Sequence, residues 1–172
     1  MKMKRKFEKG MTLPEVMTSV FIFSLLILLT SVVLREGQAQ VMYAEARIDL
    51  EESLRQSIDK MGLEIRETSP SFAAIGDNGA SLTFQIPSSV DDAGAITWSG
   101  SITYQIVGSQ LVRLDTVTGE TKPMANDIQT INFTSTGNPV STLVYTVTAR
   151  RTLLDGRDIT VTSTGEARLR NV

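Results

Sequence analysis

The sequence contains no cysteine and no histidine. Without cysteine it forms no disulfide and offers no thiolate nucleophile, and without histidine it lacks the commonest general base. The two absences also remove the usual zinc ligands. A net charge of −2 provides no overall positive field that would favour nucleic acid as a partner. We therefore predict a protein that is not an enzyme, with no cofactor, no metal site and no directly bound nucleic acid.

Charge is also missing from a long stretch near the N-terminus, between Val16 and Leu34. Counted from Met11 the stretch has 24 residues, which as a helix measure about 36 Å and exceed a hydrocarbon core of about 30 Å. Five basic residues precede it, and this bias predicts a cytoplasmic N-terminus. We expect a single-pass protein of the inner membrane, with everything after Leu34 on the extracytoplasmic side.

Two simpler interpretations of this segment fit it less well. A secretory signal peptide has an apolar core of about 7–15 residues followed by small residues, and Gln38-Ala39-Gln40 fits such a cleavage site poorly. A plain signal anchor explains the length but not Glu15, which lies just inside the apolar run. An ionised carboxylate is costly in lipid, although less so near the interface, and usually has a partner there.

The residues from Lys9 to Val16 read Lys-Gly-Met-Thr-Leu-Pro-Glu-Val. This stretch resembles the type III signal sequence of type IV pilins and pseudopilins, in which a basic leader ending in Gly precedes Thr-Leu, Glu and a hydrophobic helix. The resemblance implies cleavage between Gly10 and Met11 by a prepilin peptidase, N-methylation of Met11, and a signal motif that includes Thr12 and Leu13. Met11 replaces the commonest Phe, and Pro14 replaces an aliphatic residue, although Pro is tolerated in a first helical turn.

The resemblance also implies a partner for Glu15. In this family the Glu of one subunit attracts the N-terminal amine of a neighbour inside a bundle of apolar helices, where opposite charges interact strongly and a lone charge is costly. The implied partners are prepilin peptidase, other pilin or pseudopilin subunits and the assembly platform of the inner membrane. In the alternative, Glu15 only reaches toward the membrane interface.

Beyond Leu34 the helix is expected to continue to Arg66. Apolar residues recur there at steps of three and four, which is typical of one buried helix face; they are Tyr43, Ala46, Leu50, Leu54, Ile58, Met61 and Ile65. Gly37 is the predicted site of a bend or local melting, because Gly disfavours helix. The expected organisation is a leader (1–10), a membrane helix (11–35), an amphipathic continuation (36–67) and a β-rich head (68–172).

The rest of the chain alternates β-branched and polar residues between turn residues, which predicts short antiparallel strands. The predicted strands are 81–86, 95–98, 101–107, 110–115, 127–134, 142–150 and 158–169. Gly108-Ser109 suits a II′ hairpin, and Asp155-Gly156 suits a turn. The fold class is therefore α+β, a long N-terminal helix whose apolar stripe covers one face of a mainly antiparallel sheet.

The texture of this C-terminal half resembles the larger minor pseudopilins of type II secretion and comparable minor type IV pilins, which implies a minor subunit of the filament. The alternative is a membrane-anchored binding module that does not polymerise. For three other sets of residues we expect ordinary structural roles: solvated turns rather than calcium ligands, packed aromatics rather than a contact surface, and strand-end charges rather than a DNA-binding patch. These features are Asp77-Asn78-Gly79 and Asp91-Asp92, Trp98 and Tyr104, and Arg150-Arg151 and Arg168–Arg170, respectively.

Overall fold

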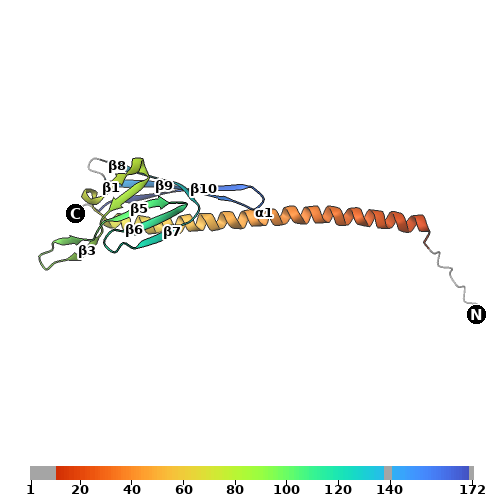
Figure 1. Cartoon of the computed structure of the whole chain (residues 1–172), viewed down its shortest axis with the longest axis horizontal. Helices are drawn as coiled ribbons and strands as arrows, with labels where there is room; N and C mark the ends of the chain where they lie inside the picture. The colour runs from red at the N-terminus through yellow and green to blue at the C-terminus, as the bar shows by residue number, and fades with distance from the viewer. Residues whose placement is uncertain (1–10, 138–140, 171–172) are drawn as a thin grey trace, which may run out of the picture. The chain divides into compact units, whose positions relative to one another are not determined.

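The computed structural model describes residues 11–137 and 141–170, and the chain divides into two compact units. The first unit is residues 1–42, described from Met11, and the second is residues 43–172, described as far as Arg170. Helix α1, Leu13–Glu67, contributes to both units (Figure 1). The predicted leader, including Gly10, lies outside the described residues.

In the first unit the helix is unbroken. Gly37 lies within α1 with helical residues on both sides, so the local melting expected at this position is wrong. A Gly in an exposed helix costs about 1 kcal/mol relative to Ala. Its neighbours Leu34, Arg35, Glu36, Gln38 and Ala39 are good helix formers, which offsets that local cost.

Among the described residues, α1 is the one helix long and apolar enough to cross a membrane, and none of its most apolar window is buried. Serine and threonine hydroxyls in this helix donate hydrogen bonds to backbone carbonyls one turn earlier. Ser19 Oγ donates to the Glu15 carbonyl at 2.8 Å, Ser24 Oγ to Val20 at 2.8 Å and Thr30 Oγ1 to Leu26 at 2.6 Å. Polar groups bonded in this way are tolerated in lipid, so the segment is suited to a single membrane span.

The second unit, called the head below, carries all the strands that the described residues form, and every pairing is antiparallel. A five-stranded sheet has the order β1-β2-β5-β6-β7, a three-stranded sheet the order β10-β9-β8, and β3 pairs with β4. The strands are β1 Ala74–Gly76, β2 Ser81–Phe84, β3 Pro87–Val90, β4 Ile96–Trp98, β5 Ile102–Val107, β6 Gln110–Asp115, β7 Thr121–Ala125, β8 Ile128–Thr136, β9 Thr142–Thr152 and β10 Asp158–Arg168.

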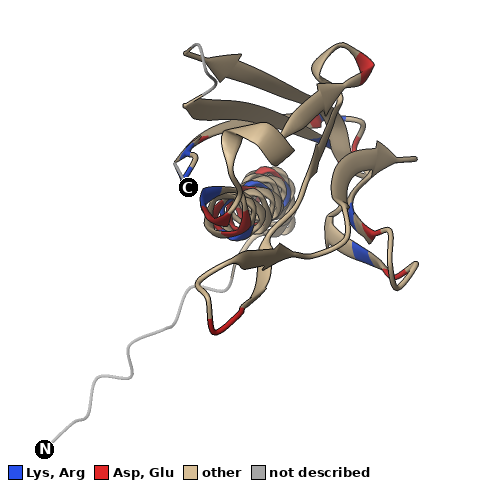
Figure 2. Ribbon diagram, turned by 90° about the vertical axis from the view of Figure 1, so that its left-hand side faces the viewer, with Lys and Arg blue, Asp and Glu red and all other residues tan. Residues whose placement is uncertain are grey.

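The head has one hydrophobic core, and the predicted helix stripe lies in it. Leu50, Leu54, Ile58, Met61 and Ile65 are buried, with Tyr43 and Ala46 partly buried against the same cluster. Figure 2, seen along the helix, shows strands arranged around it on more than one side. The helix therefore covers the inner faces of the sheets, and the predicted α+β class of one long N-terminal helix with a mainly antiparallel head is confirmed.

Both predicted hairpin turns are confirmed. Gly108 has a φ of 64° while Ser109 keeps a negative φ, and Val107 faces Gln110, which is the pattern of a II′ turn. Between β9 and β10 the Gly156 N–H donates to the Leu153 carbonyl at 2.9 Å, and Gly156 has a φ of 82°. Only Gly adopts such backbone without strain.

Three strands were not predicted, and proline explains two of the omissions. β7 contains Pro123 and β3 begins at Pro87; proline removes a ladder N–H, and both strands lie at sheet edges where this is tolerated. The third, β1, is only three residues long. The predicted strand start at Asp127 is one residue early, because Asp127 has a φ of 60° and the strand begins at Ile128.

Candidate functional site

The N-terminus of α1 is closed by a capping arrangement. The Thr12 carbonyl accepts hydrogen bonds from the N–H groups of Glu15 (3.0 Å) and Val16 (3.1 Å), so Thr12 is the N-cap residue. The Glu15 side chain folds back, and the Thr12 N–H donates to its Oε2 at 3.4 Å. Thr-x-x-Glu is the sequence signature of a capping box. Both residues were predicted to be functional for other reasons, whereas this capping interaction was not predicted.

Glu15 is thus the acidic residue of the first helical turn, where a negative charge is favoured by the helix dipole. Its contact with Thr12 is long, and the residue is exposed. Met11 and Leu13 are 71% and 78% exposed. The carboxylate is therefore oriented by its own backbone and remains accessible. Gly10, the other half of the predicted cleavage site, lies outside the described residues.

A second polar cluster joins the helix to the five-stranded sheet. The Tyr104 hydroxyl and the Arg113 Nε both donate to Glu64 Oε2, each at 2.9 Å. Tyr104 is fully buried, whereas the Glu64 and Arg113 side chains are 31% and 19% exposed. Burial, followed by the neighbouring Glu64 carboxylate, raises the pKa of Tyr104 far above its usual range. The cluster holds α1 against β5 and β6.

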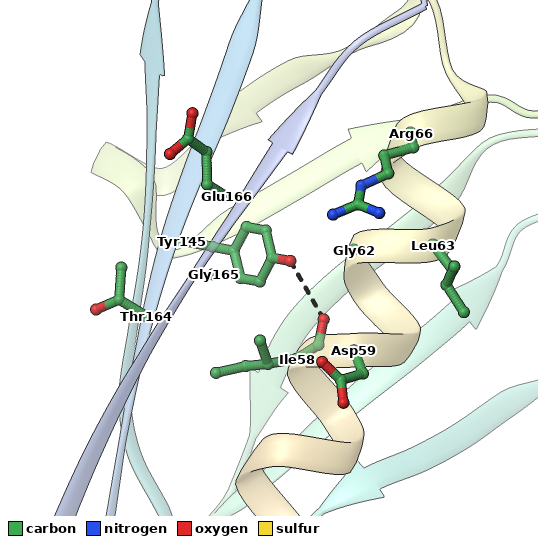
Figure 3. A pocket seen from close by; sticks show the side chains of 9 residues that line it. All are labelled: Ile58, Asp59, Gly62, Leu63, Arg66, Tyr145, Thr164, Gly165 and Glu166. Atoms are coloured by element: carbon green, nitrogen blue, oxygen red, sulfur yellow. Dashed lines mark hydrogen bonds between the residues drawn. The ribbon is translucent and has the colours of Figure 1, made fainter.

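A groove of about 470 Å³ runs between α1 and β10 (Figure 3). Tyr145 forms part of its wall, and its hydroxyl donates to the Ile58 carbonyl at 3.2 Å. The ring fits because two neighbours lack side chains. A Cβ on Gly62 would lie 2.7 Å from the Tyr145 hydroxyl, and one on Gly165 would lie 2.3 Å from ring atom Cε2. The groove is also lined by Asp59, Leu63, Arg66, Thr164 and Glu166.

The two acidic loops considered for calcium use their carboxylates to build their own turns. Asp91 Oδ1 accepts the N–H groups of Ala93 at 3.0 Å and Ala95 at 2.7 Å, while Asp77 Oδ2 accepts the Ser81 hydroxyl at 2.9 Å. Within residues 11–137 and 141–170, no three acidic side chains come together in a way that could hold a metal ion.

The basic and aromatic features also have structural roles. Arg150 pairs with Asp158, and Arg151 Nε pairs with Asp127 Oδ2 at 2.7 Å. Tyr104 is buried, as expected for a packed aromatic, and Trp98 packs on Phe72 with ring centroids 4.5 Å apart. The strand-end interpretation of Arg150-Arg151 and the packing interpretation of both aromatics agree with these contacts.

Comparison with known proteins adds no family assignment: no protein-family model matches the chain, and no curated protein matches it.

Proposed function

We propose that the chain is a structural minor subunit of a type IV pilus or a type II secretion pseudopilus. In this proposal it is trimmed between Gly10 and Met11, N-methylated at Met11, and assembled through its N-terminal helix. The observation that carries the proposal is the capped helix start, where Glu15 is held at the end of an exposed apolar helix that follows a Lys-Gly leader.

The proposed assembly step depends on pairing between an N-terminal amine and the Glu15 carboxylate. Cleavage after Gly10 creates an α-amine on Met11, and packing of apolar helices buries this amine together with Glu15. Each charge alone is costly in such surroundings, whereas an amine from one subunit within a few Å of a carboxylate from the next is favourable. The pair therefore fixes the register between neighbouring helices, and the Thr12 N–H contact orients the carboxylate beforehand.

The head supplies the extracytoplasmic part of the subunit. In the proposal it contacts neighbouring subunits and has no catalytic role, so the only chemistry of the chain is as a substrate for cleavage and methylation. Prepilin peptidase, other pilin or pseudopilin subunits and the inner-membrane assembly platform are the proposed partners. The alternative function, an anchored binding module that stays in the membrane, predicts no processing.

Processing is tested by coexpressing the full chain with a prepilin peptidase and measuring its intact mass. The proposal predicts loss of residues 1–10 and gain of one methyl group. Gly10→Ala is the matched variant, and it should remain a full-length precursor in the membrane. An unprocessed wild-type chain supports the anchored binding module, and efficient cleavage of Gly10→Ala refutes the assigned cleavage site.

Assembly is tested separately with two substitutions of Glu15. Glu15→Gln removes the charge but keeps an acceptor for the Thr12 N–H, because Gln also completes a capping box; Glu15→Ala removes both. Both variants should be processed normally, and both should fail to enter filaments. Normal incorporation of Glu15→Gln would contradict charge pairing, and failure of Glu15→Ala alone would assign the effect to capping instead.

A further inference from the structure

Strand β10 forms one edge of the three-stranded sheet, whose order is β10-β9-β8. It is 11 residues long and pairs with β9 in a continuous register, without a bulge. Its sequence contains neither proline nor lysine. Proteins commonly use short strands, bulges, proline or lysine at exposed edges, because an unmodified edge pairs readily with other chains. β10 therefore lacks the features that prevent such pairing.

The other sheet edges of the described chain are shorter or obstructed. β1 has three residues, β3 four and β4 three, and the five residues of β7 include Pro123. Against β8 lies the short 3₁₀ helix η2 (Asp77–Gly79), where a Cβ on Gly79 would meet the Phe133 carbonyl oxygen at 3.1 Å. Among the described strands, β10 is thus the longest sheet edge, and it has none of these features.

Every second residue of β10 points its backbone N–H and carbonyl away from β9, because alternate residues of an antiparallel pair bond to the neighbouring strand. At the hairpin, the Leu153 N–H donates to the Arg157 carbonyl at 2.8 Å. At the other end, the Leu169 N–H donates to the Ser141 carbonyl at 2.9 Å. Both bonds join odd-numbered residues in the register of the pair. The even-numbered residues of β10 therefore face outward.

These outward backbone groups have no partner within residues 11–137 and 141–170, where β10 pairs only with β9. The residues that carry them include Thr160, Thr162, Thr164, Glu166 and Arg168. Just beyond the strand, the N–H of Arg170, the next residue of this series, donates to the Thr68 carbonyl at 3.1 Å. The same edge thus forms a hydrogen bond where the chain supplies an acceptor, and the rest of the row is available to a ligand.

The groove between α1 and β10 lies beside this edge (Figure 3). Its α1 side includes Asp59, Leu63 and Arg66, whose spacing of four and three residues places them on one helix face. Leu63 is 63% exposed. A strand added to β10 would point alternate side chains toward α1. It would therefore place apolar side chains beside Leu63, between charges of opposite sign.

The other face of β10 is polar and exposed. Ile159 and Ala167 are buried in the core, and the residues that alternate with them lie on the exposed face; they are Asp158, Thr160, Thr162, Thr164, Glu166 and Arg168. Asp158 pairs with Arg150, whereas Glu166 belongs to no ion pair in the part of the chain that the structure describes. Facing residues of opposite charge stabilise an antiparallel pair, so a basic side chain on an added strand suits Glu166.

We propose that β10 binds an extended segment of a partner polypeptide, which adds to the sheet in antiparallel orientation. The backbone of this segment bonds to the outward N–H and carbonyl groups, its apolar side chains contact Leu63, and a basic side chain lies beside Glu166. An extended backbone is the ligand that matches a row of alternating donors and acceptors. The proposal concerns the head alone, so it applies equally to a filament subunit and to an anchored binding module.

The probe is a fluorescein-labelled peptide of 11 residues, the length of β10, in which valine alternates with threonine between terminal lysines. Its binding to the full chain in detergent is measured by fluorescence anisotropy, and saturable binding is expected. Two derivatives carry backbone N-methyl groups, one on every threonine and the other on every valine. Facing residues of an antiparallel pair share a side of the sheet, and the outward residues of β10 have exposed side chains. The threonines, which take the exposed side, are therefore the residues whose N–H groups bond to β10.

Methylation of the threonines should weaken binding at least about tenfold, because each lost hydrogen bond contributes about a factor of five in affinity. Methylation of the valines should leave the affinity unchanged. Any other pattern overturns the proposal, and so does the absence of saturable binding by the parent peptide. This comparison uses the unaltered chain and needs no variant to fold.

Two substitutions of Thr164 test the same edge on the protein. Proline removes the outward N–H and is tolerated at a strand edge, whereas valine keeps the N–H and loses only the hydroxyl, which lies 3.2 Å from that of Thr146. Thr164→Pro should weaken peptide binding at least about fivefold, and Thr164→Val should not. Urea unfolding followed by Trp98 fluorescence shows whether each head is folded.

Unchanged peptide affinity of a folded Thr164→Pro head overturns the proposal, because the peptide would then bind elsewhere. Sedimentation of the chain without peptide tests a second copy as the occupant. We expect no dimer that depends on this edge. A concentration-dependent dimer of the wild-type chain that Thr164→Pro abolishes would also overturn the proposal, because β10 would then pair with a second copy. None of these results depends on cleavage after Gly10.

Discussion

Replacing Glu64 should lower the stability of the head more than replacing a residue of any exposed ion pair. Glu64→Ala leaves the buried Tyr104 hydroxyl without its 2.9 Å acceptor, a loss of about 1–3 kcal/mol. It also removes the partner of Arg113, a partly exposed ion pair contributing about 1 kcal/mol. We therefore expect the free energy of unfolding to fall by about 2–4 kcal/mol. Tyr104→Phe should cost only about 1 kcal/mol, because Glu64 keeps its bond with Arg113.

The assay is urea unfolding of the full chain in detergent, followed by the fluorescence of Trp98, the single tryptophan. The matched control is Glu51→Ala, which breaks the exposed pair that Arg47 forms with Glu51 at 2.8 Å and should leave the midpoint unchanged. The double variant Glu64→Ala/Tyr104→Phe should be less destabilised than the sum of the single variants, since both remove the same hydrogen bond. Additive effects, or a Glu64→Ala midpoint equal to that of Glu51→Ala, would refute the assigned role of the cluster.

Two further outcomes are expected in the head. Gly165→Ala places a Cβ 2.3 Å from the Tyr145 ring, and it should lower the free energy of unfolding, measured in urea, by about 1–3 kcal/mol. The control is Gly37→Ala, whose Cβ meets nothing within 4 Å and which should leave the unfolding midpoint of the head unaltered. Equal effects of the two substitutions would contradict the packing of Tyr145 against Gly165. Burial raises the pKa of Tyr104 and of Tyr145, so above about pH 10 the unfolded chain releases protons that the folded chain retains, and stability should decline with rising pH. Tyr104→Phe should decline less steeply in the same titration, and an unchanged slope would contradict this cause.

Periodicity was enough to predict the helix and the surface it buries. The three- and four-residue steps from Tyr43 to Ile65 identified the residues that contact the sheets, because a helix that covers a sheet must present one apolar face. The local melting predicted at Gly37 is wrong because helix propensity is a weak local preference, and the good helix formers on either side outweigh one glycine.

Strands whose residues do not alternate between apolar and polar were harder to predict from the sequence. β7 is held by pairing with β6 and by the Ser57 hydroxyl, which lies 2.8 Å from the Met124 carbonyl, and neither contact has a signature within residues 121–125. The cluster of Glu64, Tyr104 and Arg113 and the groove beside Tyr145 were also not predicted. Tyr104 and Arg113 lie 40 and 49 residues from Glu64, and Tyr145 lies 87 residues from Ile58. Only the folded chain brings these residues together.

At the start of α1 the sequence indicated a candidate site, but the helix cap there was not predicted. The order of Gly10, Thr12 and Glu15 identified a candidate processing and assembly site, which remains a proposal. The same residues contain a Thr-x-x-Glu capping signature that could have been predicted from sequence, and the 3.4 Å contact between Thr12 N–H and Glu15 Oε2 was found only in the structure.

The most direct test of the account is the intact mass and N-terminal sequence of the protein isolated from its native host. We predict a mature protein that begins at N-methylated Met11, with residues 1–10 removed. A mature protein that still begins at Met1 would contradict it, because Glu15 would then have no newly formed amine on a neighbouring subunit with which to pair.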